Sequence, residues 1–150
     1  MISGIKLDTE SNLRRRFHRT PWREQVTFRT PLDRLDPFVE IIVSACGSME
    51  SGQFAIDQFV FDPRHVGPVV TPFSITLPAE GRCTLVVEGR ETVQTLLKAM
   101  LADWTDFLFV PKPKPFVIYS DHDEFTTFFA ASKSNLNRGE TVVSGRFLLD

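Results

Sequence analysis

The chain has 150 residues, 42% hydrophobic residues and a formal net charge of -2 at pH 7. This length suits one domain, and the composition excludes a disordered or fibrous protein. The balanced charge also excludes a protein that binds nucleic acid through an overall positive surface. No stretch is long and apolar enough for a membrane-spanning helix, and the first residues lack the apolar core of a secretory signal. We therefore expect a cytoplasmic protein that forms a single domain over residues 1–150.

Charge is distributed unevenly along the chain. Residues 1–30 carry a net charge of +4, whereas the remaining 120 residues carry -6. Most of the positive charge falls in residues 14–19, where four arginines surround Phe17 and His18. Such a run can grip phosphate or meet an acidic partner, but it is more often a solvated or internally paired segment. We interpret residues 1–23 as a basic N-terminal arm in front of an acidic body.

The first half of the body begins with a strand and a helix. Val26 and Phe28 fall on one face of a predicted strand over residues 24–30. Apolar residues then recur at three-four spacing from Leu35 to Met49, which predicts a helix. We expect the side chain of Asp36 to cap that helix, with a proline in its first turn and Gly52 at its end.

Strand patterns and two further helices follow. We predict an antiparallel meander from strands over residues 53–61, 69–77 and 83–87, because these segments are close in sequence. The most regular apolar stripe of the chain predicts the second helix, and its members are Val93, Leu96, Leu97, Met100, Leu101 and Trp104. The proline-rich residues 111–115 connect predicted strands over residues 107–110 and 116–119. A third helix is expected over residues 125–136, and a last strand over residues 141–149.

These elements indicate an α+β protein. We expect a mostly antiparallel sheet of about six to seven strands, packed by three helices in a single domain. Fourteen of the residues are Phe and only one is Tyr. Phe buries a large apolar area without a polar atom to satisfy, so this ratio indicates a Phe-rich core. Cys46 and Cys83 lie among apolar neighbours, and we expect two reduced thiols.

The sequence contains none of the common motifs for nucleotide, metal or covalent catalysis, so we predict no cofactor, no metal and no catalytic residue. The segment Ser120–Asp121–His122–Asp123–Glu124 is the best local candidate for chemistry. Three carboxylates and an imidazole could bind a cation or transfer protons. Because adjacent side chains diverge and the spacing is that of a capping box, we interpret the segment as the N-terminal cap of the third helix.

A non-enzymatic binding protein is the function that best fits this pattern. We expect an inhibitor of the immunity or antitoxin type, which neutralises a toxin domain such as a basic nuclease, because acidic surfaces attract basic partners. The acidic side chains that we expect to be exposed or to bind are Asp57, Glu88, Glu91, Asp103, Asp106, Asp121, Asp123 and Glu124. An aromatic anchor from exposed members of the Phe set would supply most of the affinity.

Two alternatives remain open. The first is a small phosphodiesterase or nuclease that uses His65 or His122 with a nearby carboxylate. His65 lies in a predicted turn that also contains Arg64. The second alternative is a regulatory subunit of a larger assembly, docked through the basic N-terminal segment. A partner protein is expected in either binding hypothesis, whereas a membrane or nucleic acid partner is not.

Overall fold

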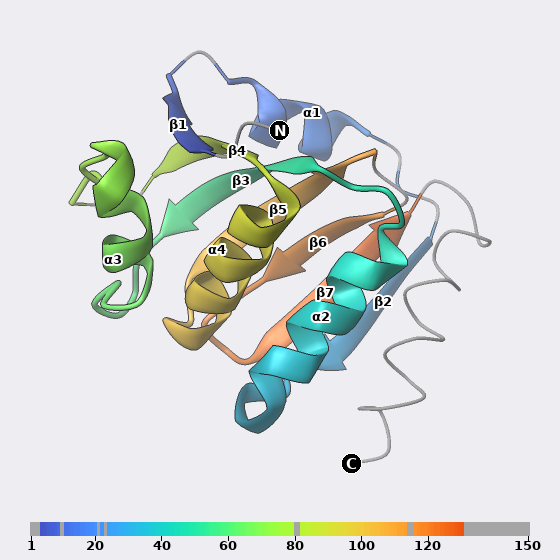
Figure 1. Cartoon of the computed structure of the whole chain (residues 1–150). Coiled ribbons are helices and arrows are strands. Elements are labelled where there is room, and N and C mark those ends of the chain that lie inside the picture. The colour runs from blue at the N-terminus through green and yellow to red at the C-terminus, as the bar shows by residue number, and fades with distance from the viewer. Residues whose placement is uncertain are drawn as a thin grey trace.

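A computed structural model describes residues 4–9, 11–20, 22, 24–79, 82–113 and 116–130. The chain forms one antiparallel sheet with helices on both faces, and Figure 1 shows this arrangement. The fold is α+β, as the sequence predicted. The elements in chain order are β1 (Gly4–Asp8), α1 (Leu13–Arg19), β2 (Glu24–Arg29), η1 (Leu32–Arg34), α2 (Leu35–Ala45), β3 (Ser51–Gln58), α3 (Val66–Val70), η2 (Thr71–Phe73), β4 (Cys83–Glu88), α4 (Arg90–Ala102), β5 (Asp106–Lys112), β6 (Val117–Ser120) and β7 (Phe125–Ala130).

Seven strands make up the described sheet, in the order β1-β4-β3-β5-β6-β7-β2. Every neighbouring pair is antiparallel. The sheet therefore has β1 at one edge and β2 at the other. Both edge strands come from the N-terminal 30 residues, which means that this segment brackets the rest of the sheet. The described part of residues 1–23, which we expected to be an arm, forms β1 and α1.

The first face of the sheet carries the main core. Helices α2 and α4 lie across it in contact with each other, in front of the strands in Figure 1. The strands contribute alternate residues to this core, among them Phe54, Ile56, Phe107, Phe109, Ile118 and Phe128. Within the described residues, the predicted Phe-rich core is confirmed, since six of the twelve largest fully buried side chains are Phe.

The apolar stripes of α2 and α4 are confirmed as core. Phe38, Ile42 and Met49 are fully buried on the first stripe, and Leu96 and Leu97 on the second. The two helices are also joined by polar contacts. The guanidinium of Arg90 donates to the carbonyl oxygens of three residues at and beyond the C-terminal end of α2, namely Val43, Gly47 and Met49. These bonds satisfy acceptors that a helix end leaves without partners.

Glycine is required at one position of β3. A Cβ atom at Gly52 would lie 2.8 Å from a ring carbon of Phe109 on the neighbouring strand. No larger residue fits there unless the aromatic ring moves. Gly52 is therefore a strand residue that lets a Phe approach the backbone, and not the helix terminator that the sequence suggested.

Helix α1 covers part of the second face. Leu13 packs there on Ala55, Leu108 and Val117, which alternate with the residues of the main core. Phe17 and Trp22 extend this small second core to the far side of the sheet, where their rings contact Phe129. Of the described helices, only α1 contributes to this second core.

Two predicted elements are wrong in type. Residues 69–77 were expected to be a strand, but Val66–Val70 is a helix and Thr71–Phe73 a 3-10 turn. Residues 125–130 were expected to begin the third helix, but they form β7. Phe128 is buried against Phe28 of β2, with ring centroids 5.4 Å apart. A neighbouring strand decided this outcome, since aromatic residues suit a pleated, half-buried surface better than a helix.

The predicted cap of α2 is also wrong. No side chain caps the N-terminus of α2, and Asp36 instead forms an ion pair of 2.6 Å with Lys98 of α4. The predicted strand over residues 141–149 and the end of the third helix lie outside the described residues. No helix in the described ranges is long and apolar enough to cross a membrane.

Candidate functional site

Most of the predicted acidic residues lie at one end of the sheet. The register pairs Gln58 of β3 with Asp106 of β5, and Ser120 of β6 with Thr126 of β7. The end of β3, the start of β5 and the turn between β6 and β7 therefore lie together. We call this region the acidic end and define it by Asp57, Asp62, Asp103, Asp106, Asp121, Asp123 and Glu124. Glu88 and Glu91 lie at the opposite end of the sheet, since Glu88 pairs with Ser51.

Asp103 is buried, with only 5% of its surface exposed, so the expectation that it lies on an exposed face is wrong. Its carboxylate accepts hydrogen bonds from the backbone N–H groups of His65 and Val66 at 2.9 and 2.8 Å. The Nδ1 atom of His65 lies 2.5 Å from the same carboxylate. Asp103 thus satisfies the free N–H groups at the start of α3 and ties that helix to the end of α4.

Asp106 is also buried, at 4% exposure, which corrects the same expectation. It accepts a hydrogen bond of 2.6 Å from the side-chain amide of Gln58 and one of 2.7 Å from the backbone N–H of His122. The Nδ1 atom of His122 lies 2.9 Å from its Oδ1. This bond to Asp106 raises the pKa of His122 above its ordinary value, although partial burial opposes the shift. A carboxylate can only accept, so Nδ1 carries a proton, and Nε2 lies 3.7 Å from Oδ1 of Asp123.

Asp57 is half-buried beneath α1 and has two internal partners. The Nε atom of Arg14 lies 2.5 Å from its Oδ1, and the Tyr119 hydroxyl donates to its Oδ2 at 2.9 Å. Burial, reinforced by the negative charge of Asp57, raises the pKa of Tyr119. Arg14 also donates to the Ile56 carbonyl at 2.7 Å. The first arginine of the basic run therefore holds α1 on the sheet.

The segment 121–124 forms a hairpin turn and does not cap a helix. The carboxylate of Asp121 accepts hydrogen bonds from the backbone N–H groups of Asp123 and Phe125, at 2.9 and 3.1 Å. Glu124 has a left-handed backbone, with φ of 70°, and its side chain pairs with Arg29 at 3.2 Å. The capping chemistry predicted for Asp121 is thus used to close the turn between β6 and β7. Asp123 is exposed, and Asp121 and Glu124 are half-exposed.

Two exposed aromatic residues lie beside these carboxylates. Phe61 is 51% exposed and Trp104 36%, and their rings meet edge to face with centroids 5.6 Å apart. A shallow pocket of about 420 Å³ lies at this pair and is bordered by Asp62, Arg64 and Asp103. We call Phe61 and Trp104 the aromatic pair. The apolar spacing predicted Trp104 on the buried stripe of α4, but the helix ends at Ala102 and leaves the indole on the surface.

Trp104 has an unusual backbone conformation. Its φ of 56° is left-handed, and it follows the last helical turn of α4 in the position where glycine is preferred. Its N–H donates to the carbonyl of Leu101, and the N–H of Thr105 donates to that of Met100. These two bonds form a Schellman motif with Trp in the place of Gly. A bulky residue in this conformation is strained, and such strain concentrates at functional sites.

The described residues contain no group of three His, Cys, Asp or Glu side chains arranged to hold a metal ion. Cys46 and Cys83 are not joined in a disulfide, and burial raises the pKa of Cys83 to about 11. A thiol with a raised pKa is a poor nucleophile. Comparison of the chain with protein-family models, with curated proteins and with solved structures finds no match.

Proposed function

We propose that this protein is a non-enzymatic binding protein that holds a basic protein partner on its acidic end. The observation that carries the proposal is the exposed aromatic pair, whose pocket is bordered by Asp62 and Asp103 together with Arg64. Tryptophan and other aromatic residues supply a large share of binding energy at protein interfaces. Phe61 and Trp104 already contact each other, so their ordering costs little when a partner binds.

The surroundings of the pair support a basic partner. Asp62 borders the pocket at the aromatic rings, and Asp121 and Glu124 line a small cavity that Trp104 also reaches. Glu124 is paired with Arg29, but Asp62 has no ion-pair partner in the part of the chain that the structure describes. Exposed carboxylates around an apolar centre attract a positively charged surface and increase its association rate.

In its narrower form the proposal makes the partner a toxin domain, such as a basic nuclease, which this protein inhibits. Two features support this form, namely the acidic surroundings of the aromatic pair and the absence of common catalytic motifs from the sequence. A toxin gene in the adjacent reading frame, whose product binds the protein in a one-to-one complex, is the expected finding. A partner of another class would leave only the broader proposal.

The test compares two variants in a capture experiment. The variant Phe61→Ser/Trp104→Gly removes the aromatic pair and keeps a residue that accepts the left-handed backbone. The control Phe73→Ser removes another exposed aromatic ring, which lies in η2 next to β1. We expect the wild type and the control to retain a basic partner that the double variant loses. Equal retention by all three proteins, each confirmed as folded by its melting temperature, would overturn the proposal.

One observation favours an enzyme as the second candidate. His65 and His122 each place Nδ1 against a buried carboxylate, an arrangement that orients the imidazole so that Nε2 can act as a general base. The expected activity is phosphodiester hydrolysis by the purified protein. Turnover of RNA, DNA or a simple phosphodiester that is lost in His122→Ala or His65→Ala would replace the binding proposal. Turnover that survives both substitutions would point to a contaminant.

A further inference from the structure

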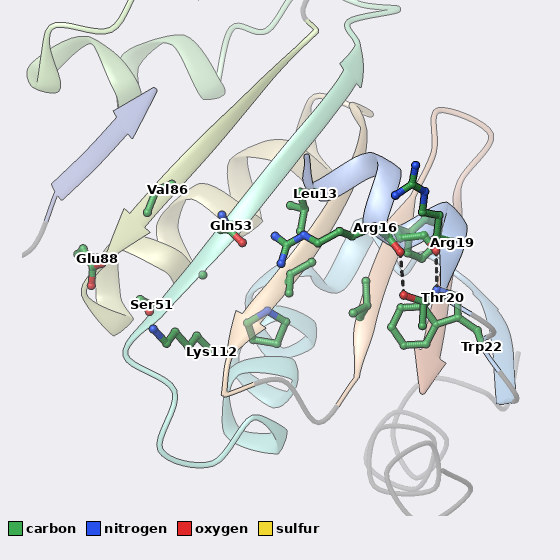
Figure 2. A pocket seen from close by; sticks show the side chains of 15 residues that line it. Leu13, Arg16, Arg19, Thr20, Trp22, Ser51, Gln53, Val86, Glu88 and Lys112 are labelled. Carbon is green, nitrogen blue, oxygen red and sulfur yellow. Dashed lines mark hydrogen bonds between the residues drawn. The ribbon is translucent and has the colours of Figure 1, made fainter. Parts of the chain in front are cut away.

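A groove lies on the second face of the sheet, away from the acidic end. It has a volume of about 790 Å³ and runs between α1 and the ends of β3, β4 and β5. Its floor follows from the strand register. Val86, Gln53 and Val110 are cross-strand neighbours in one row, and Glu88, Ser51 and Lys112 form the next row. Figure 2 shows these side chains with α1 beside them.

The groove is open because α1 covers only part of this face. Leu13 packs on Val117 at one side of the groove. Trp22, which follows α1 in the chain, also lines the groove. Val86 and Val110 are left half-buried beside it. An apolar strip of this kind on a sheet face is an ordinary feature of a binding surface.

Positive side chains border the strip. Arg16 and Arg19 of α1 and Lys112 of β5 are exposed, and none has an ion-pair partner among the described residues. In Figure 2 the Arg16 side chain extends from α1 across the groove toward β3. Arg14, on the same helix, is by contrast paired with Asp57. Lys6 of β1 is exposed and is directly opposite Val86, so its side chain adds positive charge on this face.

Glu88 is the acidic residue that lines the groove, and it lies in the row of Lys112. Polar groups without partners lie on the floor. The Gln53 amide and the Ser51 hydroxyl make no side-chain hydrogen bond within the described ranges. Gln53 offers both a donor and an acceptor between two valines, which is the combination that a peptide backbone requires. The positive groups are spread over two strands and a helix, so they suit several separate anions better than one phosphate.

We propose that this groove binds an extended acidic peptide segment of a partner protein. Carboxylates of the segment pair with Arg16, Arg19 and Lys112, its apolar side chains lie on Val86 and Val110, and Gln53 bonds its backbone. A single-stranded nucleic acid fits less well because it needs exposed aromatic faces for stacking. The rings of Phe17 and Trp22, which border the groove, pack against Phe129 instead.

The native fluorescence of the protein can report binding. The chain contains two tryptophans, so Trp104→Phe leaves Trp22, which lines the groove, as the single reporter. The probe is a synthetic octapeptide of alternating Glu and Leu, and its counterpart with Gln in place of Glu is the uncharged control. We expect saturable binding of the Glu peptide only. This test does not depend on the aromatic pair, so its failure leaves the proposed function untouched.

Two matched substitutions on α1 then separate the groove from overall charge. Arg16→Glu reverses a charge that lines the groove, and we expect it to weaken binding by about tenfold or more. Arg15→Glu makes the same change on the exposed surface of the same helix, outside the groove, and should leave binding within about twofold. Lys112→Glu replaces Arg16→Glu if that variant does not fold.

Three results would overturn the inference. The first is the absence of a saturable fluorescence change with the Glu peptide. The second is an equal loss of binding in Arg15→Glu, which would show that only net charge matters. The third is tighter binding of an eight-nucleotide single strand than of the peptide, which would assign the groove to nucleic acid.

Discussion

The indole of Trp104 is held at the surface by the backbone at the end of α4. A residue with a Cβ atom in the left-handed region pays a steric penalty that glycine avoids. The Schellman bonds and the contact with Phe61 maintain this conformation. The chain thus keeps an aromatic ring exposed at a position where glycine would cost less free energy of folding, and this supports a binding role for the ring.

Two truncations of Trp104 separate the backbone effect from the loss of the ring. Trp104→Gly and Trp104→Ala both remove the indole, but only alanine keeps the steric penalty. We expect the glycine variant to be the more stable by about 1 kcal/mol in urea unfolding. Inside a helix the order is the opposite, since alanine is favoured there. An alanine variant as stable as the glycine variant would show that the left-handed conformation is not strained.

His122 gives the folded state a dependence on pH. Its pKa is raised in the fold, chiefly by the hydrogen bond to Asp106, and the charges of Asp123 and Asp121 act in the same direction. The protonated form therefore favours folding. This contribution is fully present below the unfolded pKa of about 6.5 and is lost as the pH rises through the higher folded value.

As the pH rises, we expect the free energy of unfolding of the wild type to fall by more than that of His122→Gln. Urea unfolding between about pH 5 and 8.5 measures the difference, and the two curves should converge at high pH. His18→Gln, on the exposed surface of α1, serves as the control and should keep the wild-type slope. A His122→Gln protein with the same slope as the wild type would contradict the assignment.

At the scale of elements, α4 is the centre of the main core. Its apolar stripe faces α2 and the sheet, and Leu97 is only 1% exposed. We expect Leu97→Ala to lower the free energy of unfolding by about 2–5 kcal/mol, since it removes a buried side chain and leaves a cavity. Thr95→Ala, on the exposed side of the same helix, should change it by less than about 0.5 kcal/mol. Denaturant titration compares both variants, and similar values for the two would mean that the helix is not anchored by this face.

The hairpin of β6 and β7 shows why one element could not be predicted. Phe125, Phe128 and Phe129 have the spacing of a helix face, and Asp121 and Glu124 have the spacing of a capping box. In the structure Phe128 lies against Phe28 of β2, and Thr127 meets Thr27 across the same strand pair at 2.9 Å. Strand β2 is about 100 residues away in sequence, so no local pattern contains this contact.

At the scale of the whole molecule, the groove and the acidic end lie apart on the sheet and present different exposed charges. Arg16, Arg19 and Lys112 border the groove, whereas Asp62 and Asp123 are exposed at the acidic end. Charges that are buried or paired contribute little to attraction at a distance. Exposed charges guide a partner, but salt screens them over about 8 Å at physiological ionic strength.

Charge reversal at the two ends should therefore have different effects on association with the basic partner. We expect Asp62→Lys/Asp123→Lys to slow association and to flatten its dependence on salt, while the fold is retained. Glu88→Lys/Glu91→Lys makes the same charge change at the opposite end and should have a smaller effect. Stopped-flow measurements at several salt concentrations compare the two variants. An equal effect of both pairs would mean that net charge, and not the acidic end, controls encounter.

The sequence by itself determined the fold class, the helices α2 and α4 and their buried faces, and most of the strands. These features follow from local periodicity and from the large number of Phe residues, so they need no knowledge of distant contacts. The tertiary structure decided which acidic residues remain available. Asp103 and Asp106 are charged residues that the sequence predicts to be exposed. In the structure they are buried, and each accepts a hydrogen bond from a backbone N–H group, of His65 and His122 respectively. The aromatic pair likewise forms only where the end of α4, with Trp104, meets the segment after β3, with Phe61. A local sequence pattern cannot predict a contact between segments so far apart in the chain.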